Sequence, residues 1–228
     1  QSNVAFIQVD QMPEYKLCLL KKNVNCNDEE IYAKAIEDGT AYYKYYAITD
    51  DKEEKAYVAT FNEAEKVIAE LKEKGYPVRG ILIGDGLMRQ EFEKMAKELG
   101  VSNAIEFTGW KSGFKQVQAE LLRGHFFVFP SSGEGLPRSV IEAMASGLLC
   151  FGSKIDGVVE LLNEKMLVEN MDGHAFAQHI EPFLDDWSMA CAERNIQFEK
   201  SKEYEASILN KRRSEFYKKL RNLVDTQK

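Results

Sequence analysis

The sequence predicts an α/β fold with a doubly wound parallel sheet, in which helices cover both faces of the strands. Three observations favour this class. Short apolar runs alternate with amphipathic helical patterns from residue 63 to about residue 155, which is the pattern of repeated strand-helix units. The apolar runs are continuous, as is typical of strands buried on both faces. The chain of 228 residues has 44% hydrophobic side chains, enough to fill a sizeable core.

A helix is predicted from residue 63, because apolar side chains recur there at the spacing of one helical face. They are Ala64, Val67, Ile68 and Leu71, and Gly75 follows as a helix end. The next elements alternate in the same way. They are a strand over Val78–Ile83, a helix closed by Gly100, a strand over 104–107, a helix over 114–122, a strand over 125–129, a helix after Pro137 and a strand over 148–151.

The two ends of the chain are less regular. Beyond residue 155 the pattern predicts a short strand over 166–168 and helices from residue 172 to about residue 223. Pro182 is expected to break the first of these helices, since proline cannot donate the helical hydrogen bond. Near the N-terminus a strand is predicted over Val4–Val9. We therefore divide the chain into an N-terminal segment (1–62) with the first strand and an insertion, a core (63–170) and C-terminal helices (171–228).

The charge balance argues against a nucleic-acid-binding surface. The chain has 30 Lys and Arg against 37 Asp and Glu, a net charge of −7, whereas nucleic-acid binding requires a concentrated basic footprint. One stretch is basic, and it alternates with aromatic and aliphatic residues. It contains Lys211, Arg212, Arg213, Lys218, Lys219 and Arg221, together with Phe216, Tyr217 and Leu220. We interpret it as the solvated face of a terminal helix rather than as a patch for membrane or nucleic acid.

The cysteine and histidine patterns predict neither disulfides nor a metal site. Four cysteines occur without a Cys-x-x-Cys pair, which favours reduced thiols in the cytoplasm. His174 and His179 are five positions apart, and that spacing does not align two ligands on one helix face. The sequence has no apolar run of the roughly 18 residues that a membrane span needs and no leader before Val4. We therefore expect a soluble protein without metal or cofactor.

The richest candidate site is the junction that follows the predicted strand over 125–129. Ligands of open parallel sheets bind where strands end and helices begin. Here Glu134 lies in the loop and Glu142 inside the next helix, eight positions later. Gly133 and Gly135 allow the backbone to approach a ligand, and the free amides of the helix start favour a diphosphate. A carboxylate accepts paired hydroxyls well, so the two glutamates suit the ribose and the hexose of a nucleotide sugar.

This junction resembles the Glu-x7-Glu motif of retaining glycosyltransferases with the GT-B fold, in particular family 4. The family signature is PS-x-x-EG-x-x-x-x-x-x-EAMA-x-G, and the chain reads PSSGEGLPRSVIEAMASG from Pro130. The resemblance extends upstream through 83–86 and 105–110, and downstream through 157–162. It implies a Rossmann-like domain that forms the C-terminal, donor-binding half of a GT-B fold.

The resemblance also implies a role for individual residues. Glu134 contacts the transferred sugar and is the catalytic residue, and Glu142 holds the ribose. The remaining expected contacts are the amides of Gly135 and Leu136 with phosphate, Trp110 and Lys111 near the base, and Gly84 and Gly86 along the crevice. For the basic pair that neutralises the diphosphate, two segments are open. The strand Val4–Val9 supplies Lys16 as the lysine, with Val9 in place of the expected arginine, and an alternative first strand over 56–61 supplies only Lys66.

The function implied is transfer of a hexose from a UDP- or GDP-linked donor to a polysaccharide or lipid-linked acceptor. The partner would be an N-terminal, acceptor-binding domain, which this sequence lacks, so the chain alone should be poorly active. The resemblance places the enzyme in the cytoplasm, peripheral at the inner membrane face through that domain. Two alternatives remain open. One is a nucleotide-sugar 2-epimerase, which shares the architecture, and the other is a non-catalytic pseudo-transferase that binds a partner through the tyrosine-rich residues 42–46.

Overall fold

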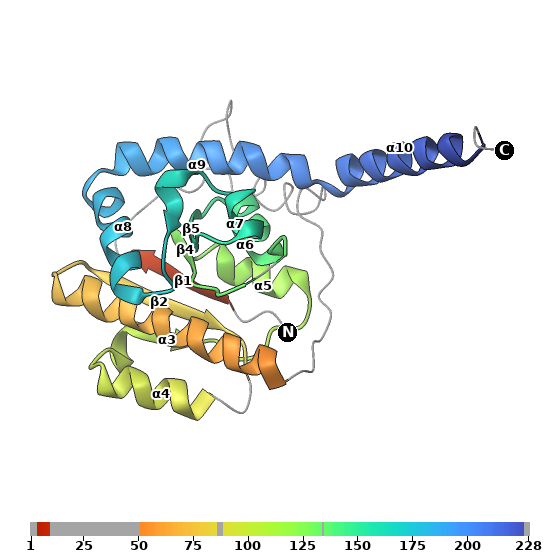
Figure 1. Cartoon of the computed structure of the whole chain (residues 1–228). Helices are drawn as coiled ribbons and strands as arrows, with labels where there is room; N and C mark the ends of the chain where they lie inside the picture. Colours follow the sequence, from red (N-terminus) through yellow and green to blue (C-terminus); the bar gives the residue numbers. More distant parts are fainter. Residues whose placement is uncertain (1–3, 10–50, 86–88, 134, 226–228) are drawn as a thin grey trace.

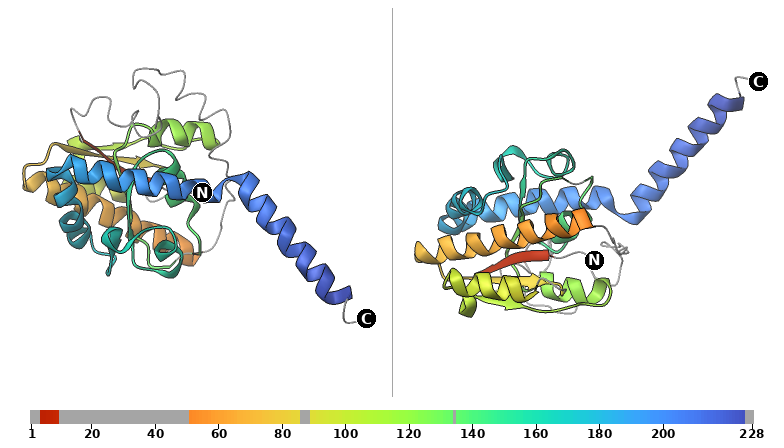
Figure 2. Two further views of the ribbon diagram at one scale, coloured as in Figure 1. Left: turned by 90° about the horizontal axis from the view of Figure 1, so that it is seen from above. Right: turned by 60° about the horizontal axis from the view of Figure 1, so that its bottom comes forward.

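A computed structural model of the chain describes residues 4–9, 51–85, 89–133 and 135–225. The described strands form one six-stranded sheet in the order β3-β2-β1-β4-β5-β6 (Figure 1). They are β1 (Val4–Val9), β2 (Val78–Ile83), β3 (Ile105–Phe107), β4 (Phe126–Phe129), β5 (Leu149–Ser153) and β6 (Leu167–Val168). Helices lie on both faces of this sheet (Figures 1 and 2). The predicted α/β class, with its Rossmann-like arrangement, is confirmed.

The helices follow the strands in the alternating order that the sequence predicts. They are α3 (Asp51–Glu73), α4 (Arg89–Glu98), α5 (Phe114–Leu121), α6 (Arg138–Ala145), α7 (Asp156–Val159), α8 (Gly173–Asp185), α9 (Trp187–Ser201) and α10 (Ala206–Asp225), with 3-10 turns η1 (Ser102–Ala104), η2 (Glu164–Met166) and η3 (Lys202–Tyr204). The helix expected from residue 63 begins earlier, at Asp51, and so crosses the boundary drawn between the N-terminal segment and the core. That division stays a prediction.

The sheet is parallel except at β1. Strand β2 pairs in parallel with β3, and β4, β5 and β6 are parallel to one another. Strand β1 runs antiparallel to both of its neighbours, with Val4 opposite Ile83 and Val9 opposite Val78. The expectation of an entirely parallel sheet is therefore wrong at this strand. Helical crossovers hold the later strands parallel, whereas residues 10–50 separate β1 from α3, so no short crossover fixes its direction.

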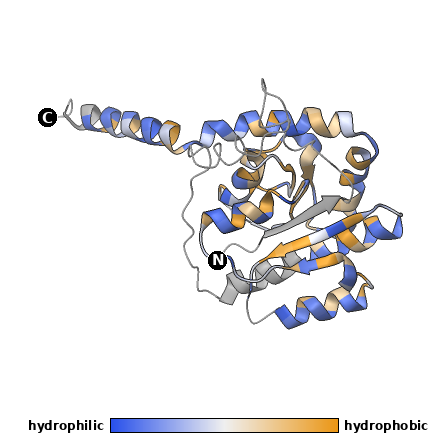
Figure 3. Cartoon of the chain, turned by 180° about the vertical axis from the view of Figure 1, so that it is seen from behind, coloured by the Kyte–Doolittle hydropathy of each residue, from blue (hydrophilic) through white to orange (hydrophobic). Residues whose placement is uncertain are grey.

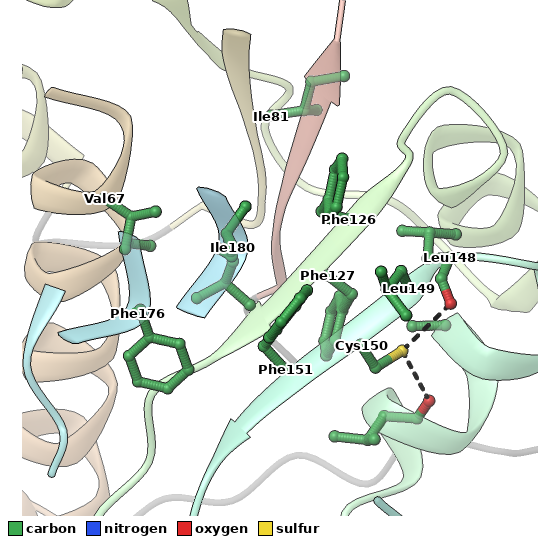
Figure 4. Packing of buried hydrophobic residues seen from close by; sticks show 14 of the residues in the cluster. Val67, Ile81, Phe126, Phe127, Leu148, Leu149, Cys150, Phe151, Phe176 and Ile180 are labelled. Atoms are coloured by element: carbon green, nitrogen blue, oxygen red, sulfur yellow. Dashed lines mark hydrogen bonds between the residues drawn. The ribbon is translucent and has the colours of Figure 1, made fainter. Parts of the chain in front are cut away.

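The core is built on the two faces of β5, because successive side chains of a strand point to opposite faces. On one face the Phe151 ring meets the ring of Phe183 of α8, with centroids 5.4 Å apart. On the other face Cys150 lies against α6, and its Sγ approaches the carbonyl of Val140. Figure 4 shows Cys150 and Phe151 of β5 with Val67 of α3 and with Phe176 and Ile180 of α8. All of these residues are buried, which explains why the strands read as continuous apolar runs.

Helix α9 completes the hydrogen bonding of β5 through a side chain. Strand β6 pairs only with Gly152 and Ser153, so the earlier part of β5 lacks a strand on that side. The amide of Gln197 accepts a hydrogen bond from Cys150 N at 2.8 Å and donates one to Cys150 O at 3.0 Å. The buried Arg194 donates to the carbonyl of Gly147 through Nε at 2.8 Å. These bonds fasten α9 to the sheet.

Two sequence expectations about local structure are wrong. Pro182 does not break α8, which continues through it to Asp185. The proline stands near the C-terminal end, where Asp186 N still bonds to Pro182 O at 3.0 Å, so little of the helix depends on the lost donor. The alternative first strand over 56–61 lies inside α3 instead, because the helical pattern extends upstream of residue 63. Residues 42–46 lie outside the described part.

Hydropathy follows this architecture. Hydrophobic residues concentrate in the sheet and on the inner sides of the helices, and hydrophilic residues predominate along α10 (Figure 3). Among the described helices, none combines the length and the apolar character required to cross a membrane.

Candidate functional site

The candidate site lies at the edge of the sheet where β2, β3, β4 and β5 end. Because these strands are parallel, their carboxyl ends meet at this edge, where α/β folds bind ligands. Gly84 follows β2, Thr108 follows β3, and the loop over 130–137 connects β4 to α6. We call the last segment the β4–α6 loop. Of the nominated residues, Glu134, Gly135 and Leu136 belong to this loop.

The β4–α6 loop is held at both ends and exposed in the middle. At its start, Ser131 N donates a hydrogen bond to Ser153 Oγ at 3.1 Å, and both residues are buried. At its end, the buried Pro137 precedes the first residue of α6. Gly135 and Leu136 are exposed between these anchors, and Leu136 retains 42% of its accessible surface. The middle of the loop therefore stands at the strand ends, open to a ligand.

Packing inside the protein does not account for the two glycines of this loop. A Cβ atom placed on Gly133 or Gly135 meets no other atom within 4 Å. Gly152 of β5 is different, because a Cβ there lies 2.6 Å from Val158 Cγ1. The open space above Gly133 and Gly135 leaves their backbone accessible, as close approach of a ligand requires.

Helix α6 begins without a side-chain cap. Its N-cap residue, Pro137, has an extended ψ of 110° and makes no capping side-chain bond. The amides of the first turn thus have no helical acceptor, and the helix dipole favours an anion at this end. Glu142 follows one turn into the helix and is 1% exposed. Its immediate neighbours Ile141 and Ala143 are buried too, so the helix holds this carboxylate in the protein interior next to the anion-favouring end.

The loops after β2 and β3 are tied to each other at the same edge of the sheet. Gly84 N donates to Gly109 O at 3.1 Å, and Thr108 N donates to Leu82 O at 3.0 Å. Gly84 and Gly109 have φ values of 143° and 71°, a region that glycine adopts readily and other residues rarely do. The side chain of Arg89 lies close by, with Nη1 3.6 Å from Asp85 Oδ2. The sequence reasoning did not nominate this arginine, although it follows Gly84 by five positions.

Trp110 and Lys111 follow these loops and differ in their surroundings. Trp110 is 55% exposed. The Lys111 ammonium lies 2.8 Å from Glu120 Oε1 of α5, and Arg123 binds Glu120 and Glu106. Burial raises the pKa of Glu120, but the hydrogen bonds from Lys111 and Arg123 outweigh it, and the pKa is lowered overall. Lys111 is therefore paired with Glu120 in this structure, and its contact with a base stays a prediction.

Three nominated residues, Glu134, Gly86 and Lys16, lie outside the described part of the chain. Strand β1 ends at Val9, which pairs with Val78 at the edge of the sheet opposite the candidate site. The other basic candidate, Lys66, lies on α3 with its Nζ 2.7 Å from Glu63 Oε1. In the described ranges, no group of three or more metal-ligating side chains is found.

Sequence reasoning also missed Ser153, the acceptor that anchors the β4–α6 loop. A small polar residue at the end of an apolar strand is the only signal for it in the sequence. The hydrogen bond joins two elements that are 22 positions apart, and a residue pattern does not reveal such a pairing.

A family model described as "Glycosyl transferases group 1" matches residues 56–204. Among curated proteins, the chain is similar to "Putative glycosyltransferase EpsF" of Bacillus subtilis (strain 168). The two are 31% identical over 176 residues, which cover 74% of this chain and 43% of EpsF. The chain thus spans less than half the length of this relative.

Two solved structures share the fold. One is the "Crystal structure of Anabaena Alr3699/HepE in complex with UDP and glucose". It has a TM-score of 0.58 and 22% identity, over 68% of this chain and 44% of that one. The other is the C-terminal domain of a glycosyl transferase group 1 family protein (LpcC) from Francisella tularensis. It has a TM-score of 0.57 and 19% identity, over 64% of this chain and 79% of that one.

Proposed function

The chain belongs to the group 1 glycosyl transferases, and from this membership we propose that it is the donor-binding half of a retaining GT-B hexosyltransferase of family 4. The donor is a UDP- or GDP-linked hexose, and the acceptor is a polysaccharide or a lipid-linked saccharide. The observation that carries this proposal is the start of α6. An uncapped helix end follows an open glycine loop, and a buried glutamate lies one turn inside.

Each part of that arrangement suits one part of a nucleotide sugar. The exposed backbone of Gly135 and Leu136 suits the diphosphate, because a helix start stabilises negative charge. The buried Glu142 carboxylate lies one turn inside that helix, and we propose that its two oxygens accept the paired hydroxyls of a ribose. Glu134, in the loop, is proposed to contact the hexose. Trp110 is exposed after the β3 loop, and we propose that it stacks on the base.

The proposed reaction is a front-face substitution at the anomeric carbon. The bond from that carbon to the diphosphate oxygen breaks, the acceptor hydroxyl oxygen bonds to the same face, and the hydroxyl proton passes to the leaving diphosphate oxygen. The amides at the start of α6 stabilise the charge that develops on the leaving diphosphate, which is the usual role of preorganised donors at such a position. Arg89, close to the β2 and β3 loops, is the described basic side chain that we propose to assist.

We propose that a second, N-terminal domain binds the acceptor. The chain covers 43% of EpsF but 79% of an isolated C-terminal domain of a family member. That contrast supports the assignment of this chain to the C-terminal half. On this proposal the chain binds donor weakly and transfers poorly alone, and the complete enzyme works at the cytoplasmic face of a membrane.

Titration calorimetry of the chain with UDP, GDP and their sugars tests the proposal. We expect saturable heat with the nucleotides of one base at millimolar ligand or below. Glu142→Gln should abolish that heat, whereas the exposed Glu98→Gln on α4 should preserve it. No heat from a folded wild-type chain would overturn the donor-site assignment. Conversion of the donor sugar without any acceptor would instead indicate an epimerase.

A further inference from the structure

Helix α5 begins at the same edge of the sheet as α6, and it begins in a similar way. The connection over 108–113 leads from the end of β3 to Phe114, the first residue of α5. The N-cap residue of α5, Gly113, makes no capping side-chain bond, and a Cβ atom placed on it meets no other atom within 4 Å. The start of α5 is therefore open, as the loop before α6 is.

One turn into α5, a polar side chain lies in the protein interior. Gln118 is 4% exposed, and its Oε1 is enclosed without a hydrogen bond from any described residue. Its neighbours on the helix, Val117 and Leu121, are buried in the apolar core. A buried acceptor that is left unsatisfied destabilises a fold, and native proteins keep few such groups. Gln118 therefore requires an explanation.

The other glutamine of α5 has a structural role that Gln118 lacks. Gln116 is exposed, and its Oε1 accepts a hydrogen bond from Ser112 N at 2.9 Å, which fastens the connection before the helix. Packing alone would favour an apolar side chain at position 118, between Val117 and Leu121. The polarity of Gln118 thus indicates a hydrogen-bonding partner that the described part of the chain does not supply.

Gln118 occupies in α5 the position that Glu142 occupies in α6. Each is the fifth residue of its helix, and both are buried. Side chains of a helix tilt toward its N-terminus, which in both helices is the end at the candidate site. Gln118 and Glu142 are therefore both directed from the interior toward the strand ends.

The separation of the two helix starts suits the two ends of a nucleoside diphosphate. Strands β2 and β1 lie between β3 and β4 in the sheet, so the ends of β3 and β4 are roughly 14 Å apart at the usual strand spacing. A nucleoside diphosphate carries its base at one end and its diphosphate at the other. With the diphosphate at the start of α6, an extended nucleotide that lies along the strand ends brings its base to the start of α5.

We propose that Gln118 reads the edge of the donor base, and that this base is uracil. The inference rests on the proposed function and names the nucleotide of its donor. A carboxamide offers an acceptor and a donor side by side. Gln118 Oε1 accepts a hydrogen bond from N3–H of uracil, and Nε2 donates one to O4. Trp110, in the connection before α5, stacks on the face of the same ring.

Guanine suits this site less well than uracil. Its N1–H and its amino group are neighbouring donors, and a carboxylate accepts from both. The carboxylate of α5 belongs to Glu120, which is bound by Lys111 at 2.8 Å and by Arg123. Glu120 is thus engaged within the protein, and Gln118 is the buried hydrogen-bonding side chain that α5 offers to a base.

Titration calorimetry of the full chain with UDP tests the role of the side chain. Gln118→Met removes both hydrogen-bonding atoms and keeps a side chain of similar length. The affinity for UDP should fall roughly tenfold, whereas Tm should stay the same or rise, because an unsatisfied group leaves the core. A purely structural Gln118 would give a lower Tm with unchanged affinity. Gln178→Met, at an exposed position of α8, is the control and should change neither quantity.

Gln118→Glu tests the identity of the base, with UDP and GDP titrated at pH 8. The carboxylate places an oxygen opposite O4 of uracil, but it accepts from both donors of guanine. The ratio of UDP affinity to GDP affinity should therefore fall by at least about tenfold. A general loss of stability would lower both affinities together and leave their ratio unchanged.

Two results would overturn the proposal and leave the donor site in place. The first is tighter binding of GDP than of UDP by the wild type. The second is a wild type that binds UDP with an affinity and a base preference that neither Gln118 variant alters. A folded wild-type chain that binds neither nucleotide would instead overturn the donor-site assignment, and this inference with it.

Discussion

The backbone N–H of Ser131 donates to the side-chain oxygen of Ser153 at 3.1 Å, and this bond joins the loop after β4 to the last residue of β5. Both residues are buried, and the same N–H also donates to Phe129 O at 3.1 Å. The bond to Ser153 fixes one end of the loop that carries the proposed phosphate and hexose contacts. The geometry of that loop therefore depends on a residue that belongs to the neighbouring strand.

Ser153→Ala should leave the Ser131 amide without its side-chain acceptor. We expect the free energy of unfolding to fall by about 1 kcal/mol and the affinity for the nucleotide ligand to fall severalfold. Hydrogen exchange at the Ser131 amide should become faster, and this can be measured by NMR or mass spectrometry. Ser214→Ala, on exposed α10, is the control. Unchanged exchange at Ser131 would show that Ser153 does not hold the loop.

Gly133→Ala should leave the fold intact and weaken ligand binding. The added Cβ meets no protein atom within 4 Å, so Tm should change little, but the methyl group occupies space that the ligand needs. Gly152→Ala should instead lower the free energy of unfolding, because the added Cβ lies 2.6 Å from Val158 Cγ1. Overpacking of this kind costs about 1–3 kcal/mol. Calorimetric unfolding and nucleotide titration of both variants test these two expectations. A nucleotide affinity of Gly133→Ala equal to that of the wild type would contradict the first.

Glu65 on α3 should make stability depend on pH. It is 0% exposed, neither of its carboxyl oxygens has a hydrogen-bond partner among the described residues, and burial raises its pKa from 4.5 to about 8. Because the folded protein holds the proton more tightly than the unfolded chain, stability is greatest below pH 4.5 and falls as pH rises toward about 8. The slope is at most about 1.4 kcal/mol per pH unit.

Glu65→Gln should remove this component of the pH dependence and stabilise the protein at pH 8 more than at pH 5. Urea unfolding of wild type and variant at several pH values gives the difference directly. Glu98→Gln, which alters an exposed carboxylate, should leave the profile of the wild type unchanged. Parallel pH profiles for wild type and Glu65→Gln would contradict the assignment.

Gln197→Leu should destabilise the whole domain. It removes both hydrogen bonds to the backbone of Cys150 and leaves a buried donor and a buried acceptor unsatisfied. We expect a loss of about 2–4 kcal/mol, measured by chemical unfolding. The same change at Gln178, which is exposed on α8, should cost far less. If the two losses were similar, the Gln197 amide would not be a structural partner of β5.

Much of the fold was predictable because local pattern and tertiary structure agree in it. The strand over Val78–Ile83 is found as predicted, since a continuous apolar run between helical patterns has few alternatives. The strand over Val4–Val9 was also predicted correctly, but its direction was not. Strand direction depends on the connection that follows, and no pattern in residues 10–50 specifies it.

The candidate site was predictable in part, because its motif is local. The loop from Pro130 to Pro137 and the buried Glu142 are sequence neighbours, and a spacing rule finds them. Ser153 and Arg89 are brought to the same region by the sheet, and their chemistry alone does not distinguish them from other polar residues. The basic stretch was predicted as the solvated face of a terminal helix, and residues 210–221 of α10 are all exposed.

The link between Gln197 and Cys150 has a consequence for synthesis of the protein. The two residues are 47 positions apart, so on the ribosome β5 emerges well before the helix that satisfies its backbone. Until α9 has left the exit tunnel, the growing chain exposes an incomplete strand edge of the kind that recruits foreign strands. A chaperone, or a pause in translation beyond residue 201, would be most useful during that interval.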